Sequence, residues 1–250
     1  MRLTVLGGCG AWPTAEQACS GYLVEYEDFR LLIDPGYATM PRLLRHAQVD
    51  AVDAVLVSHG HPDHCADLNP LLRARGLSDV PPPALPVYAP HGALDAVLAL
   101  DRPGMLATAY DLHEFGPGDR LTVGPFTVDT CLLPHHVPNA GIRLATPDAV
   151  LAYTGDTGPS PDIPRLAEGA DLFLSEATYV DKVPDADAPY LLTARLAGEY
   201  ARQAGAGSLL LTHLWPDTDP GAALRTAAGA FSGPIDIAAP DLTQEAGHRP

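Results

Sequence analysis

One short stretch, residues 58–64, restricts the possible folds of this chain more than any other feature. It reads SHGHPDH and follows a predicted buried strand at 53–58, so three imidazoles and a carboxylate stand within six positions at a strand end. Imidazole nitrogen and carboxylate oxygen are ligands of divalent metals. Such a site needs a tight turn. Gly60 can adopt backbone conformations that other residues rarely reach, and Pro62 makes the backbone rigid. The stretch therefore predicts a metal site, the alternative being a solvated polar loop.

Three more residues able to bind a metal stand where apolar β runs end. His135 follows residues 126–133, Asp156 follows a run at 149–154, and His213 follows one at 208–212. Gly155 permits a close turn before Asp156. Taken singly, Asp156 is also suited to cap a helix or turn, and His213 to be a hydrogen-bonded core histidine. Taken with residues 58–64, they predict that several strand ends meet at one metal site.

The rest of the chain alternates β-rich runs with helical stretches, which become more frequent in its second half. Further strands are expected at 3–6, 21–26, 29–34, 86–89, 120–123, 126–131, 142–145, 171–175 and 235–238, and helices near 39–48, 66–74, 192–204 and 220–230. With 250 residues, of which 46% are hydrophobic, the chain suits one large α/β domain spanning 1–250. We expect two mixed sheets packed face to face and covered by helices.

Charge and hydropathy exclude several classes of partner. The 15 Lys+Arg and 31 Asp+Glu residues give a formal net charge of −16, which opposes binding to large nucleic acids. No apolar run approaches the roughly 18 residues that a membrane span needs, and the apolar N-terminal run is too short for a signal peptide. The four cysteines lack CxxC spacing, as expected of free thiols. These features predict a cytoplasmic protein with no membrane partner.

The order of these motifs resembles the metallo-β-lactamase fold superfamily over nearly the whole chain. The resemblance implies an αββα sandwich of two mixed β-sheets flanked by helices, with two divalent metal ions at the edge of the sheets. Zn²⁺ fits the ligands, and Mn²⁺ or Fe would be accepted by the same set. By the resemblance, one ion is held by His59, His61 and His135, the other by Asp63, His64 and His213, and Asp156 bridges them.

The choice between His135 and His136 rests on the same resemblance. Neighbouring side chains on an extended segment point to opposite sides, so both are not easily ligands of one metal. Residues 135–143 look like the H-x-x-P-x-x-G-x-R motif of the tRNase Z-like branch, whose ligand is the first histidine. We therefore assign His135 to the metal. His136 stays a candidate for catalysis or substrate contact, with a plain exposed histidine as the alternative.

The chemistry expected of two metals is hydrolysis by a bridging hydroxide, with Asp63 orienting it or taking its proton. Glu176 begins an E-A-T stretch that resembles the tRNase Z-like branch, and is a candidate catalytic residue or a simple turn residue. The compact length and residues 6–10, 20–23 and 209–216 look like small bacterial cyclic-nucleotide phosphodiesterases. We therefore expect a small phosphodiester substrate, with Arg143 and Tyr179 as candidate contacts to it or, alternatively, as surface and packing residues.

One residue departs from the family pattern. A histidine that usually follows the E-A-T motif, and is taken as the proton donor, is replaced by Leu191. The loss of a general acid costs about 10²–10⁴-fold unless Tyr190, His136 or a metal-bound water substitutes. The alternatives are a thioester or lactone hydrolase, a metal-binding relative with weakened catalysis, and a tRNase Z-like ribonuclease, although the long basic arm of those enzymes has no counterpart here. The resemblance also implies a homodimer.

Overall fold

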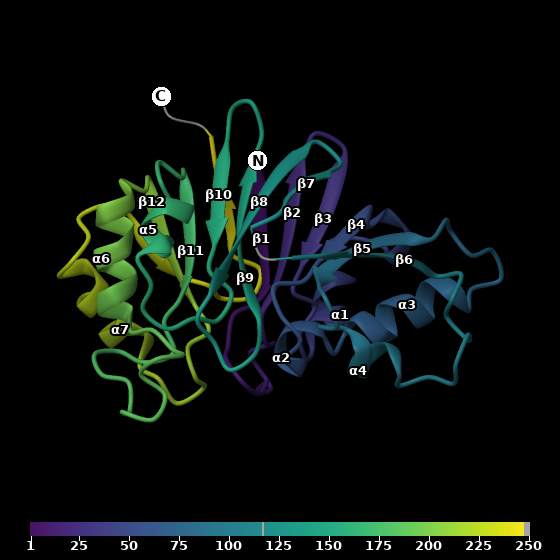
Figure 1. The fold of residues 1–250 in the computed structure, drawn as a ribbon, viewed down its shortest axis with the longest axis horizontal. Coiled ribbons are helices and arrows are strands. Elements are labelled where there is room, and N and C mark those ends of the chain that lie inside the picture. The colour runs from purple at the N-terminus through teal and green to yellow at the C-terminus, as the bar shows by residue number, and fades with distance from the viewer. Residues whose placement is uncertain (117, 248–250) are drawn as a thin grey trace.

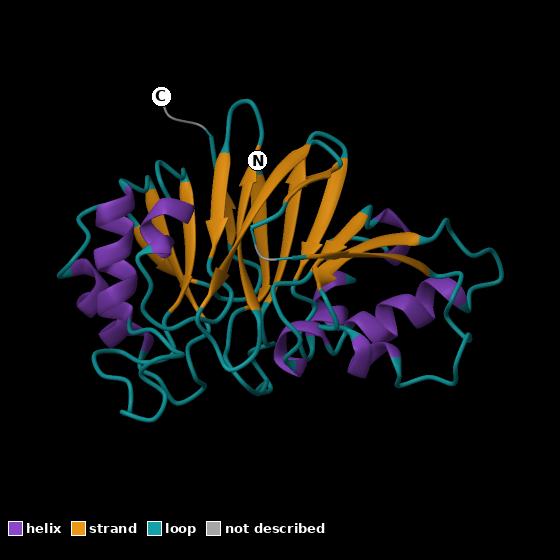
Figure 2. Ribbon diagram, viewed as in Figure 1, coloured by secondary structure: helices purple, strands orange, loops and turns teal. Residues whose placement is uncertain are grey.

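The computed structural model describes residues 1–116 and 118–247. Two seven-stranded β-sheets pack against each other in the middle of the molecule, and helices cover the outer face of each sheet (Figures 1 and 2). This arrangement confirms the predicted αββα sandwich of two mixed sheets. No helix in these residues is long and apolar enough to cross a lipid bilayer.

The first sheet has the strand order β14-β1-β2-β3-β4-β5-β6. Its strands are β1 (Arg2–Gly7), β2 (Gly21–Tyr26), β3 (Phe29–Ile33), β4 (Ala54–Leu56), β5 (Leu85–Pro90), β6 (Tyr110–Phe115) and β14 (Thr243–Glu245). The neighbours from β3 to β6 run parallel, while β14, β1, β2 and β3 pair antiparallel. The carboxyl ends of β3 and β4 therefore lie at the same edge of this sheet.

The second sheet has the order β13-β12-β11-β10-β9-β8-β7. Its strands are β7 (Arg120–Val123), β8 (Phe126–Leu133), β9 (Asn139–Ala145), β10 (Val150–Tyr153), β11 (Leu172–Glu176), β12 (Ser208–Thr212) and β13 (Ile235–Ile237). The strands from β10 to β13 run parallel, and β8 runs antiparallel to β9, which is itself antiparallel to β10. The carboxyl ends of β8, β10 and β12 consequently share one edge.

The helices form two separate layers. The first sheet is covered by α1 (Thr39–Leu43), α3 (Leu68–Gly76) and α4 (Asp95–Leu98), with α2 (Pro62–Cys65) at its edge, and the second by α5 (Asp162–Leu166), α6 (Ala194–Ala204) and α7 (Pro220–Ala228) (Figure 1). Helix α6 begins where the Thr193 side chain accepts a hydrogen bond from the Leu196 amide, and ends at Gly205 in the left-handed conformation.

Alternation along the strands divides the core into three apolar layers. On β11, Leu172 and Leu174 face the other sheet, whereas Phe173 between them packs under α6. On β3, Leu32 faces the helices of the first layer and its neighbours face the opposite sheet. Each such fully buried side chain contributes about 1.5–3 kcal/mol to folding. Packing on both faces holds the strand ends in fixed positions.

The sequence did not predict β6, β14 or the short helices α4 and α5. β6 is an edge strand with mostly polar or half-exposed side chains, and β14 has the sequence TQE and is defined by pairing with β1. Such strands carry no apolar signal, because backbone hydrogen bonds rather than burial define them. The helices expected at 39–48 and 66–74 are also different: α1 ends at Leu43, and α3 runs from Leu68 to Gly76.

Candidate metal centre

The ends of four strands bring together all seven residues expected to bind metal. β4 leads into residues 59–64, and β8, β10 and β12 lead into the other three. The donor atoms form two groups that share Asp156, and within each group they all lie within 4.8 Å of one another. The groups are His59, His61, His135 and Asp156, and Asp63, His64, Asp156 and His213. This division matches the one implied by the resemblance.

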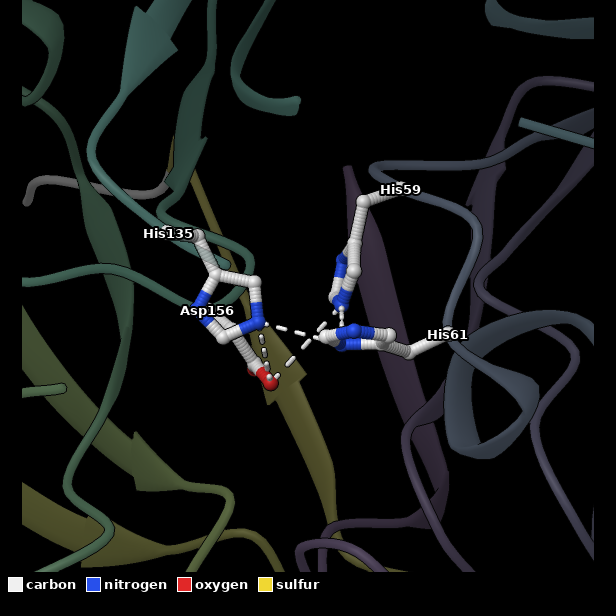
Figure 3. A group of neighbouring side chains, drawn as sticks. All are labelled: His59, His61, His135 and Asp156. Atoms are coloured by element: carbon white, nitrogen blue, oxygen red, sulfur yellow. Dashed lines mark hydrogen bonds and ion pairs between the residues drawn. The ribbon is translucent and has the colours of Figure 1, made fainter. Parts of the chain in front are cut away.

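In the first group, nitrogen atoms converge from both sheets (Figure 3). His61 Nδ1 lies 3.1 Å from His59 Nε2 and 3.1 Å from His135 Nε2. Both Nε2 atoms lie 3.8 Å from an oxygen of Asp156. Zinc bound tetrahedrally at about 2.0–2.1 Å places its nitrogen ligands roughly 3.3 Å apart, so the spacing suits such an ion.

Hydrogen bonds on the far side of these rings leave the converging nitrogens as lone pairs. His135 Nδ1 donates to the carbonyl of Tyr190 at 3.0 Å. His59 Nδ1 lies 3.0 Å from Ser58 Oγ, which itself donates to Asp34, so the ring nitrogen is the donor in this contact. A single proton on His61 Nδ1 cannot form good hydrogen bonds to both His59 Nε2 and His135 Nε2. A cation satisfies all three nitrogens, and the donor set therefore fits a divalent metal.

The second group is more acidic and more deeply buried. His213 Nε2 lies 3.2 Å from Asp63 Oδ2 and 3.1 Å from Asp156 Oδ2, and His64 Nε2 lies 3.3 Å from Asp156 Oδ1. His64 Nε2 and Asp156 Oδ1 are buried without a hydrogen-bond partner. Leaving a buried polar atom unpaired costs about 1–3 kcal/mol, and a metal ion bound between these atoms would remove that cost. The second group also fits a divalent cation.

Electrostatics differ between the two groups. Burial lowers the pKa of His59 well below its usual value and that of His135 to about 4, so both rings are neutral and offer lone pairs. Burial also opposes the charged form of His213, but the nearby Asp156 and Asp63 carboxylates outweigh it and raise the pKa to about 9. Protons therefore compete with a cation for the second group more than for the first.

A further carboxylate, which the sequence analysis did not single out, holds the second group in place. Asp34 directly follows β3 and is fully buried. It accepts hydrogen bonds from the Ser58 amide at 2.7 Å, Ser58 Oγ at 2.6 Å and Tyr153 Oη at 2.8 Å. His64 Nδ1 lies 2.8 Å from the same carboxylate, which turns His64 Nε2 toward Asp156. A carboxylate behind a ligating imidazole fixes its tautomer and orientation.

A protein-family model described as "Beta-lactamase superfamily domain" matches residues 29–214, a stretch that contains all seven residues of the two groups. The chain belongs to the beta-lactamase superfamily. The superfamily relative named "Probable metallo-hydrolase YhfI" from Bacillus subtilis is 32% identical over 246 residues, which cover 95% of this chain and 97% of that protein.

Other superfamily members resemble the chain over most of its length. The crystal structure of YhfI has a TM-score of 0.89, with 98% of this chain and 99% of that one covered. Ribonuclease Z of Myxococcus xanthus is 27% identical, and the match covers 98% of this chain and 97% of that protein. The short form of human tRNase Z has a TM-score of 0.79 at 22% identity, and the match covers 98% of this chain and 99% of that one. It therefore shares the fold.

The N-terminal loop of this superfamily member closes over Asp63. The Ala11 amide donates to Asp63 Oδ2 at 2.9 Å, from a left-handed backbone conformation with φ of 63°. Gly10 approaches the His213 ring so closely that a Cβ at this position would lie 2.8 Å from it. Any other residue would push the loop or the imidazole out of place. This loop therefore helps to position Asp63 and His213.

Glu176, a candidate catalytic residue in the sequence analysis, lies behind His213, and its catalytic role stays a prediction. It is fully buried, and its carboxylate accepts hydrogen bonds from Thr178 Oγ1 at 2.7 Å and from the amides of Thr157 and Leu192. Thr178 Oγ1 in turn lies 2.9 Å from His213 Nδ1. Burial raises the pKa of Glu176 to about 7. Because Glu176 has no exposed surface, its described connection to the site runs through Thr178.

The other residues singled out by the sequence lie at different distances from the site. His136 and Leu191 line the same cavity as His61, Asp63 and His213, and the His136 ring lies 4.2 Å from that of Tyr190. Arg143 does not belong to this cavity lining. Its guanidinium donates to the carbonyl of Leu166 at the end of α5, and the contact with substrate stays a prediction.

Proposed function

We propose that this protein is a metal-dependent hydrolase that cleaves a small phosphodiester such as a cyclic nucleotide. The observation that carries the proposal is the pair of donor groups joined by Asp156. Two divalent ions bound there, Zn²⁺ being the first candidate and Mn²⁺ or Fe the others, would activate a water and stabilise negative charge on the phosphoryl group. The role of the protein is to hold, orient and enclose these partners.

Within this proposal, Asp63 and His136 have separate roles. Asp63 lines the cavity, and its Oδ2 is fixed by the Ala11 amide and His213 Nε2, so that the carboxylate can orient the attacking water or take its proton. His136 is exposed and lines the same cavity, with its ring against that of Tyr190. It is the candidate donor of a proton to the leaving oxygen.

The cavity favours a small substrate over RNA. Its volume is about 260 Å³, just below the roughly 300–1,000 Å³ of typical ligand pockets. Among the described residues that line it are three carboxylates, Asp63, Asp156 and Asp187, and no lysine or arginine. With a net charge of −16 as well, a long polyanion would be repelled outside the metal centre. A ribonuclease like the Myxococcus xanthus relative is the second candidate, supported by that similarity.

The proposed activity is tested by hydrolysis of a substrate panel. We expect the Zn²⁺- or Mn²⁺-loaded protein to cleave 3′,5′- or 2′,3′-cyclic AMP and bis(p-nitrophenyl) phosphate, and to lose this activity after chelation. Thioesters, lactones and a precursor tRNA are measured beside them, because two metals can also polarise a carbonyl. Turnover of thioesters or lactones with none of any phosphodiester would overturn the assignment, and cleavage of the tRNA alone would favour the ribonuclease.

Restoring a histidine at position 191 tests whether a missing proton donor limits catalysis. Leu191 is 8% exposed and lines the cavity beside the metal-binding residues. We expect Leu191→His to raise kcat on cyclic AMP by up to about 10²-fold. The gain on bis(p-nitrophenyl) phosphate, whose leaving group needs no proton, should be much smaller. Leu191→Asn is the matched polar control, and an equal gain in that variant would contradict a general-acid effect.

A further inference from the structure

Three aromatic side chains form a wall beside the metal centre. The Trp215 ring lies 5.6 Å from that of Trp12 and 5.3 Å from that of Tyr179, measured between ring centres. Trp215 also lines the cavity that contains Asp63, Asp156 and His213. We call Trp12, Tyr179 and Trp215 the aromatic wall. Through Trp215, the aromatic wall borders the cavity that contains the metal-binding groups.

Backbone hydrogen bonds fix this wall relative to the metal centre. Trp215 comes two residues after His213, whose left-handed backbone, with φ of 57°, turns the chain as it leaves β12. The Trp215 carbonyl accepts from the Thr218 amide at 2.8 Å, which closes a tight turn. The Gly10 amide donates to the carbonyl of Leu214 at 3.0 Å and ties this turn to the N-terminal loop. The two loops are therefore held against each other.

Trp12 is held by the loop that positions Asp63. Its amide donates to the carbonyl of Gly10 at 2.8 Å, and its carbonyl accepts from the Cys9 thiol at 3.2 Å. The preceding residue, Ala11, donates to Asp63. Even so, 46% of Trp12 is exposed, so part of its aromatic surface is open to a ligand.

The charges around the cavity restrict what can bind against this wall. The described lining residues offer no cation beyond the histidines, and they include three carboxylates. A second phosphate on the substrate would thus have no partner and would be repelled. Affinity beyond the metal centre must come from an uncharged group. The flat side chains of the wall suit a planar one.

We propose that Trp215, supported by Trp12 and Tyr179, stacks a planar aromatic group, namely a nucleobase, attached to the phosphodiester that the metal centre binds. This inference rests on the proposed function and narrows it to nucleoside phosphodiesters with a single negative charge. Stacking of a base on an aromatic side chain contributes a factor of about 5 to 150 in affinity. The wall would therefore supply most of the discrimination between cyclic nucleotides and base-free analogues.

The kinetic test compares two substrates that differ only in the base. They are 3′,5′-cyclic AMP and methyl β-ribofuranoside 3′,5′-cyclic phosphate. We expect wild-type kcat/KM to favour cyclic AMP by about 5- to 150-fold, Trp215→Ala to abolish most of that preference, and Trp215→Phe to retain it. Tyr26→Ala is the matched control. Tyr26 is an aromatic residue at the carboxyl end of β2, away from the sheet edge where β3 and β4 end, and it packs near Phe126. This variant should keep the wild-type preference.

A binding measurement separates failure of this inference from failure of the proposed function. The chain has two tryptophans, and both belong to the aromatic wall, so tryptophan fluorescence, excited selectively over the nine tyrosines, reports this wall alone. We expect adenosine to quench the fluorescence of the metal-free protein, and ribose not to do so. Equal hydrolysis of both substrates together with no quenching by adenosine would overturn the stacking role. Absence of hydrolysis with quenching intact would instead overturn the phosphodiesterase function.

Discussion

Replacing Asp156 with asparagine is expected to cause the largest loss of metal and activity of any single substitution in this protein. Asp156 belongs to both donor groups, with oxygen atoms 3.1 Å from His213 Nε2 and 3.3 Å from His64 Nε2. The amide removes the one negative charge that the two groups share and replaces one of the two carboxylate oxygens with an NH2 donor. We expect kcat/KM to fall by roughly 10³-fold or more, since bound metals contribute several kcal/mol to stabilising the transition state.

Metal content distinguishes this effect from general damage. By mass spectrometry of the eluted metals, we expect wild type to hold two ions per chain, Asp156→Asn fewer than one, and His61→Ala about one. Asp187→Asn is the matched control, because Asp187 lines the same cavity but belongs to neither donor group. It should retain two ions. Full occupancy in Asp156→Asn would contradict the bridging role.

Replacing Asp34 with alanine is expected to have the largest effect on stability. Asp34 is fully buried and takes hydrogen bonds from Ser58, Tyr153 and His64. The substitution leaves these buried donors without an acceptor, which we expect to lower the free energy of unfolding by roughly 3–5 kcal/mol. For a chain of this size that corresponds to a melting temperature lower by roughly 10 °C.

The measurement for Asp34 is unfolding in EDTA, because bound metal would otherwise add its own stabilisation. Asp53→Ala is the control, since this exposed carboxylate accepts a single backbone hydrogen bond from Arg30 at the start of β4. It should cost less than about 1.5 kcal/mol. The milder Asp34→Asn should bind metal about 10- to 100-fold more weakly than wild type, as expected when the partner of a ligating imidazole is altered. Equal stability of the two alanine variants would contradict the role of Asp34.

The metal-binding residues could be predicted from the sequence because each has a local signal. Residues 58–64 are adjacent in the chain, and His135, Asp156 and His213 each follow an apolar run that forms a strand. Their division into two groups came from the family resemblance. The αββα architecture followed from the alternation of strands and helices, whereas β6 and β14 lack the apolar pattern on which such predictions depend.

The remaining features depend on contacts between distant segments. Asp34 contacts Tyr153 across 119 positions of sequence, and its place at a strand end was the one signal that could have found it. Glu176 could not be assigned to a position behind His213 without knowing that Thr178 lies between them. The aromatic wall is similar, because Trp12 and Trp215 come from opposite ends of the chain. No periodicity of either segment predicts that they meet.

Binding of two metal ions in two groups joined by Asp156 is tested most directly by anomalous diffraction from crystals of the Zn²⁺-loaded protein. We expect two zinc peaks roughly 3.5–4 Å apart. One peak should lie among His59, His61 and His135, and the other among Asp63, His64 and His213, with Asp156 contacting both. A single peak, or two peaks that do not share Asp156, would contradict it.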